Sequence, residues 1–134
     1  MKLVIGVVGV VLLLIGLSVY VRTAPVRPLA VEGQYTADTD LAGGYVAVRR
    51  FEGDACDRIA RLTQIAQATP RTRILSTDPL RFVTRSRVIG FPDITQVFVQ
   101  DGVLTVHANL VFGAADLGVN KARVLAWLEQ LGPL

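Results

Sequence analysis

Residues 94–111 read ITQVFVQDGVLTVHANLV, two runs rich in β-branched residues on either side of an Asp-Gly pair. Asp-Gly is a preferred dipeptide for a two-residue hairpin turn, because both of its positions adopt positive φ without much strain. The sequence therefore predicts antiparallel strands over residues 94–100 and 103–111, joined at Asp101-Gly102.

Further strands and two helices are predicted around this hairpin. Strand-like runs cover residues 45–50, 71–76 and 80–89, with a turn at 77–79 and a break at 90–93. A helix follows Asp54, a residue suited to the N-cap, and ends at Thr69, because the residue before a proline is pushed out of the helical conformation. Val124, Trp127 and neighbouring apolar residues recur at helical spacing and predict a last helix that ends at residues 132–133.

The element order is β-α-β-β-β-β-α, which predicts an α+β domain in which helices pack on a small antiparallel sheet. This is the order of the TATA-binding-protein-like fold, a comparison of topology that carries no function. The domain is expected over residues 45–134. Residues 22–44, which hold several prolines and glycines, are expected to form an extended linker. The single cysteine, Cys56, excludes an intrachain disulfide.

Residues 3–21 form an uncharged run of mostly Val, Leu and Ile. As a helix this run would reach about 28 Å, close to the ~30 Å hydrocarbon core of a bilayer. Gly16-Leu17-Ser18 would suit a signal-peptide cleavage site, but the apolar run continues past it. We therefore expect one uncleaved transmembrane anchor, with Tyr20 at the interface and Arg22 closing the span.

The basic residues that flank this span give almost no orientation preference. Because only two residues precede the span, we expect it to act as a start-transfer segment. The sequence thus predicts a single-pass inner-membrane protein of the bacterial envelope, with its domain facing the periplasm and the lipid bilayer as a partner. The formal net charge of +3 is too small to indicate binding of nucleic acid.

Two stretches resemble a known family. They are TRSRVIGFPD, residues 84–93, and FGAADLGVNKARV, residues 112–124. Together they are similar to the family called domain of unknown function 1499 (DUF1499), over about residues 45–131. Ala115 and Lys121 stand where members often carry serine and arginine. The resemblance implies the domain and an N-terminal membrane segment, but it implies no reaction.

Arginines mark the first candidate site. Arg85 and Arg87 are two residues apart on a predicted strand and therefore point to one face, which Arg81 shares. Their guanidinium groups would suit a phosphate, a carboxylate or a lipid headgroup. The alternative is a solvated face with Arg–Asp pairs, for which Asp93 is the nearest acid. Candidate ligand-binding residues are Arg85, Arg87, Asp93, His107 and Asn109.

The start of the last helix carries Asp116, Gly118 and Asn120. Free N–H groups at such a start bind anions, but we favour a cap, in which an Asx side chain accepts these N–H bonds and the glycine permits a tight entry. Pairing of Asp116 with Arg87 or Arg123 is a further structural interpretation.

No catalytic constellation stands out. Ser86, His107 and Asp93 would make a hydrolytic triad on paper, but Ser86 lies within a strand and lacks a nucleophile turn. One histidine and one cysteine are a poor basis for a metal site, and no cofactor is expected. The sequence predicts a non-enzymatic binding or scaffolding module for an anionic or amphiphilic ligand or a membrane protein partner. The alternative is an uncharacterised hydrolase that uses Ser86 and His107.

Overall fold

The computed structural model describes residues 1–26 and 35–133, which form an N-terminal helix and an α+β domain. The elements in chain order are α1 (Lys2–Thr23), β1 (Thr39–Leu41), β2 (Gly44–Arg50), α2 (Ala55–Ala68), β3 (Thr72–Thr77), β4 (Leu80–Arg85), β5 (Pro92–Gln100), β6 (Val103–Leu110) and α3 (Val119–Leu131).

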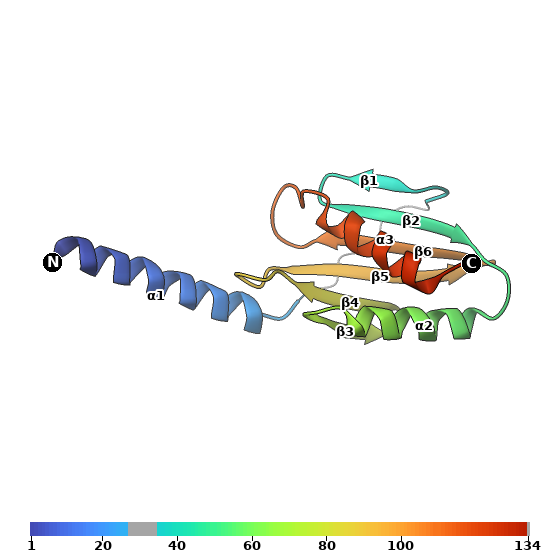
Figure 1. Ribbon diagram of the computed structural model, residues 1–134, viewed down its shortest axis with the longest axis horizontal. Helices are drawn as coiled ribbons and strands as arrows, with labels where there is room; N and C mark the ends of the chain where they lie inside the picture. The colour runs from blue at the N-terminus through green and yellow to red at the C-terminus, as the bar shows by residue number, and fades with distance from the viewer. Residues whose placement is uncertain (27–34, 134) are drawn as a thin grey trace.

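All strands join one antiparallel sheet in the order β1-β2-β6-β5-β4-β3 (Figure 1). The predicted hairpin is β5–β6, which pairs from Asp93 with Leu110 to Gln100 with Val103. Asp101 and Gly102 both have positive φ, 51° and 71°, as the two-residue turn requires. The hairpin prediction is therefore confirmed.

Both domain helices lie on one face of the sheet, in front of it in Figure 1. The apolar sides of α2 and α3 close the core against β2, β4, β5 and β6. This core consists of Tyr45, Ala47, Leu62, Ala66, Phe82, Val97, Leu104, Val106, Ala108, Val124, Trp127, Leu128 and Leu131. The predicted α+β class is confirmed, whereas the TATA-binding-protein-like label stays a prediction.

Two predicted boundaries differ from the structure. The region predicted as a linker contains β1, which pairs with β2 at the edge of the sheet, while residues 27–34 of that region lie outside the described residues. The strand predicted over residues 80–89 ends at Arg85. Ser86 Oγ accepts hydrogen bonds from the N–H groups of Gly90 (3.0 Å) and Phe91 (2.9 Å), which closes a tight loop.

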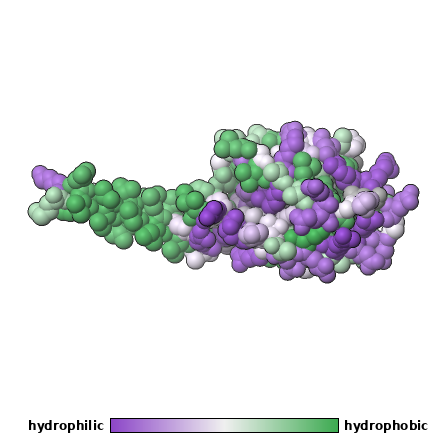
Figure 2. All heavy atoms as spheres, viewed as in Figure 1, coloured by the Kyte–Doolittle hydropathy of each residue, from purple (hydrophilic) through white to green (hydrophobic). Residues whose placement is uncertain are grey.

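Helix α1 projects away from the domain (Figure 1), and apolar side chains cover its surface along most of its length (Figure 2). Of its residues only Val21 is buried. The helix is long and apolar enough to cross a membrane, a property that a signal sequence near an N-terminus shares.

Candidate functional site

The predicted row of three arginines does not form, because β4 ends at Arg85 and Arg87 lies in the loop that follows. Arg81 donates from Nε to Gln96 Oε1 at 3.0 Å. Arg85 instead donates from Nη1 to two backbone carbonyls, Val21 O at 2.8 Å and Gly90 O at 3.0 Å. Arg85 therefore joins the end of α1 to the β4–β5 loop.

No carboxylate of the described residues bonds the Arg85 guanidinium. Its Nη2 is buried without a partner within residues 1–26 and 35–133. Burial lowers the pKa of Arg85, and the neighbouring positive charges of Arg73 and Arg22 lower it further. The predicted alternative, in which Asp93 pairs with this row, is wrong, because Asp93 pairs with Arg123 on the helix side of the sheet.

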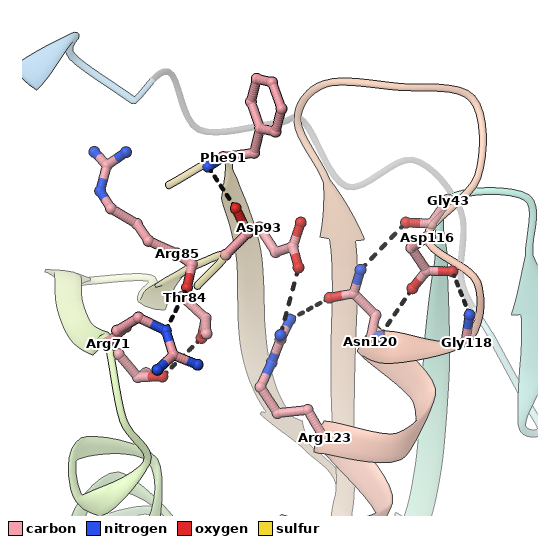
Figure 3. A network of polar contacts seen from close by, with 12 residues as sticks. Gly43, Arg71, Thr84, Arg85, Phe91, Asp93, Asp116, Gly118, Asn120 and Arg123 are labelled. Atoms are coloured by element: carbon pink, nitrogen blue, oxygen red, sulfur yellow. Dashed lines mark hydrogen bonds and ion pairs between the residues drawn. The ribbon is translucent and has the colours of Figure 1, made fainter. Parts of the chain in front are cut away.

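A polar network links β5 to the start of α3 (Figure 3). Arg123 donates from Nη1 to Asp93 Oδ2 at 3.4 Å and from Nη2 to Asn120 Oδ1. Asn120, which is fully buried, also donates to Gly43 O at 3.4 Å. Asp116 accepts from the N–H groups of Gly118 (3.1 Å) and Asn120 (2.8 Å), so its side chain caps the helix.

The charges of Asp93 and Arg123 are incompletely compensated. The Arg123 side chain is only 9% exposed and that of Asp93 20% exposed. Burial raises the pKa of Asp93 and lowers that of Arg123, in both cases against the opposing effect of the partner's charge. Nε of Arg123 is buried and has no partner in the described part of the chain. One N–H of the guanidinium is therefore not accepted by any described residue.

A cleft of about 440 Å³ opens beside this network, between α2, the turn that follows it, β4 and α3. Its walls combine apolar side chains with the guanidinium-bearing residues Arg71 and Arg123. Trp127 lies in the wall and donates from Nε1 to Thr69 Oγ1 at 2.8 Å. The full lining is Ile65, Ala68, Thr69, Pro70, Arg71, Thr84, Val119, Arg123, Ala126, Trp127 and Gln130.

At the arginine end of the cleft, the backbone conformation of Arg71 and a hydrogen bond to a backbone carbonyl hold its side chain in place. Arg71, with a φ of 62°, follows the end of α2 and donates from Nε to Arg85 O at 3.0 Å. Next to it the Thr72 and Thr84 hydroxyls are 2.8 Å apart, one donating to the other. The C-terminus of α2 and the N-terminus of α3 lie on the side of the domain from which α1 projects (Figure 1). The cleft therefore has its cationic end towards α1.

The residues proposed for a hydrolytic triad do not meet. Gln96 is opposite both His107 and Arg81, whereas Pro92 is opposite Arg85. Four residues of strand separate these positions, so His107 lies about 13 Å or more from Ser86. Asp93 faces the helices, while the strand alternation places His107 on the opposite face. The Ser86–His107 pair on which the hydrolase alternative depended therefore does not form.

His107 and Asn109 lie on the face of the sheet away from the helices. His107 is 9% exposed, the Tyr35 ring packs edge-on against it at 5.7 Å, and burial lowers its pKa. Neither ring nitrogen of His107 has a partner among the described residues. Within residues 1–26 and 35–133 no three His, Cys, Asp or Glu side chains gather as a metal site requires.

Sequence reasoning missed Arg71 and the cleft. The two stretches singled out by their family resemblance do point to the polar network, because Arg123 of the second stretch donates to Asp93 of the first. That contact brings together two segments that are far apart in the sequence.

The fold and this site define a small α+β domain carried beside an apolar helix, with a cationic cleft between its two helices. The chain belongs to the family described as "Protein of unknown function (DUF1499)", whose model matches residues 20–131. The match begins at Tyr20 and so includes the last turn of α1. No curated protein matches the sequence.

Proposed function

We propose that this protein is a membrane-tethered, non-enzymatic binding module that takes an anionic amphiphile in the cleft between α2 and α3. One observation carries the proposal: apolar walls meet two guanidinium-bearing residues, Arg71 and Arg123, in the same cleft, and Arg123 Nε is buried without a partner among the described residues.

An anionic headgroup would complete the environment of Arg123. It would lie beside the guanidinium, whose Asp93 partner is 3.4 Å away, and would add the negative charge that this ion pair supplies incompletely. Arg71, at the same end of the cleft, would add a second fork of donors. The apolar tail would then lie along Ile65 and Trp127, because burial of its methylene groups is favourable.

We further propose that α1 is retained as a single-pass anchor in an inner membrane, with the domain in the periplasm. Arg85 bonds a carbonyl of the last turn of α1, and Ser18 Oγ donates to Ile89 O at 3.0 Å. Cleavage near Ser18 would remove this contact and most of the helix, so the contacts support retention. A tethered cleft with its cationic end towards α1 would draw its ligand from the membrane.

The sole tryptophan of the chain, Trp127, provides the assay, because it lines the cleft. The full-length chain in uncharged detergent micelles would be titrated with dodecyl phosphate while tryptophan emission is recorded. We expect a saturable change that dodecyl alcohol does not produce. Arg71→Gln should weaken binding about tenfold, since one charge-assisted hydrogen bond contributes about 1.5 kcal/mol.

The matched control is Arg50→Gln, which removes the same charge from an exposed residue that does not line the cleft. This variant should bind as the unmodified chain does. Equal responses to the phosphate and the alcohol, or equal losses in both variants, would refute the proposed cleft site.

A further inference from the structure

The most exposed large apolar side chains of the described domain gather at one end of it. They are Val88 (82% exposed), Phe112 (59%), Leu117 (96%) and Val119 (55%). The first three lie in two loops, residues 86–91 between β4 and β5 and residues 111–118 between β6 and α3. We call these two loops the tip.

The tip is a single surface because its two loops adjoin neighbouring strands, β5 and β6, at the same end of the sheet. Asp93 near the start of β5 pairs with Leu110 at the end of β6, and Val111 N donates to Pro92 O at 3.2 Å. The rings of Phe91 and Phe112, one from each loop, have centroids 6.0 Å apart. Apolar side chains of both loops therefore face solvent side by side.

The end of α1 is bonded to this tip. Ser18 Oγ donates to Ile89 O at 3.0 Å, and Arg22 Nη2 donates to Val88 O at 3.2 Å. Gly90 makes the approach feasible, since its φ is +92° and a Cβ there would lie 2.7 Å from the Arg22 Cγ. The β4–β5 loop is thus at the level of the last turn of α1.

If α1 spans a membrane, that level is the boundary of the bilayer. The 22 residues of α1 would extend about 33 Å, slightly more than the ~30 Å hydrocarbon core. If α1 spans this core, Ser18 lies just inside its edge and Arg22 at the lipid phosphates. The loop carbonyls bonded to Ser18 and Arg22 are then at interfacial depth, and Figure 2 shows hydrophilic atoms gathered where the apolar helix meets the domain.

Leu117 violates two local rules at once. Its φ of 54° is left-handed, a conformation that glycine and asparagine adopt more readily than leucine. Its side chain is also almost fully exposed to solvent, a position that polar residues occupy more favourably than leucine. Neither packing within the described residues nor backbone geometry accounts for a leucine here, which favours contact with an apolar partner.

We infer that the tip is a second membrane-contact surface, and that its partner is the bilayer that holds α1. Val88, Phe112 and Leu117 insert into the outermost part of the acyl chains, in the leaflet that holds the C-terminal end of α1. Arg22 and Arg87 contact the lipid phosphates of that leaflet. This inference rests on α1 being retained as an anchor, as proposed above, but it does not require a ligand in the cleft. Contact through two loops and a helix fixes the orientation of the domain on the membrane.

Depth-dependent fluorescence quenching tests this surface in the full-length chain. The native Cys56 is exposed at the start of α2, the end of that helix away from α1, and gives the control label. In a Cys56→Ser background, Val88→Cys reports the tip and Leu13→Cys reports the middle of α1. The labelled chains are placed in phosphatidylcholine–phosphatidylglycerol vesicles that contain spin-labelled acyl chains.

We expect strong quenching at residue 13, quenching at residue 88 several times that at residue 56, and almost none at residue 56. Leu117→Asn should reduce quenching at residue 88 while leaving the domain folded, because asparagine tolerates the left-handed conformation. The matched control Leu125→Asn changes a partly exposed leucine on α3, outside the tip, and should leave quenching at residue 88 unchanged.

Three outcomes would overturn the inference. Quenching at residue 13 but not at residue 88 would refute the tip and leave the anchor standing. Absence of quenching at both positions would refute anchor and tip together. Protection of residue 88 from aqueous iodide without quenching by lipid would show that a protein or a second copy of the chain covers the tip instead.

Discussion

Removal of Asp93 tests whether the buried ion pair exists for stability or for binding. At the observed 3.4 Å, attraction between Asp93 and Arg123 is about 5 kcal/mol for an effective dielectric constant of 20. Desolvation costs several kcal/mol for each ion, so the net contribution of the pair is near zero. In Asp93→Ala, the desolvation cost of the buried Arg123 charge remains, whereas its attraction to Asp93 is lost.

We therefore expect Asp93→Ala to lower the free energy of unfolding by about 3 kcal/mol. This is the lower end of the range for removing one partner of a buried ion pair, because the Asp93 side chain is still 20% exposed. Replacement of both ions by Asp93→Val and Arg123→Met should restore stability to within about 1 kcal/mol of the unmodified chain. The residual loss reflects Asn120 Oδ1, which would lose its donor.

Urea unfolding of the full-length chain in micelles, followed by Trp127 emission, measures both values. A loss of about 3 kcal/mol should lower the urea midpoint by about 2 M for a domain of this size. The double variant should also lose the response to dodecyl phosphate. If the double variant were as unstable as Asp93→Ala, the pair would be structural and the reasoning about incomplete compensation would be wrong.

Three other changes have defined outcomes in urea unfolding followed by circular dichroism. The hydrogen bond from Arg49 holds the pKa of Asp38 well below its usual range. The ionised Asp38 carboxylate therefore stabilises the folded domain above about pH 4, and this contribution is lost as the pH falls through the pKa of the folded state. Asp38→Asn should therefore cost about 1 kcal/mol at pH 7 and nothing at the acid limit, because both side chains are about one third exposed and screened. Trp127→Ala should cost about 3–5 kcal/mol, since this side chain is 1% exposed in the core. Gly44→Ala should cost at least about 2 kcal/mol, because a Cβ there would lie 2.1 Å from Ala108 O and must separate β2 from β6.

Local patterns accounted for much of the fold. The β5–β6 hairpin follows from alternation around Asp101-Gly102, and α2 begins where Asp54 accepts from Cys56 N at 2.8 Å. β1 could not be predicted in this way, because its three residues have no periodicity and become a strand only by pairing with β2. The end of β4 depends on a side chain, Ser86, whose hydroxyl bonds the following loop.

The candidate site was less accessible to sequence reasoning. Strand alternation placed Arg81 and Arg85 on one face, but it could not indicate that the end of α1 would accept a hydrogen bond from Arg85. The Asp93–Arg123 pair and the cleft beside it depend on how α3 crosses the sheet, which no local spacing determines.

Photo-cross-linking with an anionic amphiphile tests the central claim, that the cleft holds such a ligand, most directly. The full-length chain in vesicles would be irradiated with an alkyl phosphate that carries a diazirine on its tail, and the modified peptides would be identified by mass spectrometry. We predict cross-links in residues 65–71 and 119–130 that excess dodecyl phosphate suppresses, beside unsuppressed labelling of α1. Cross-links confined to α1 and the tip would contradict the account.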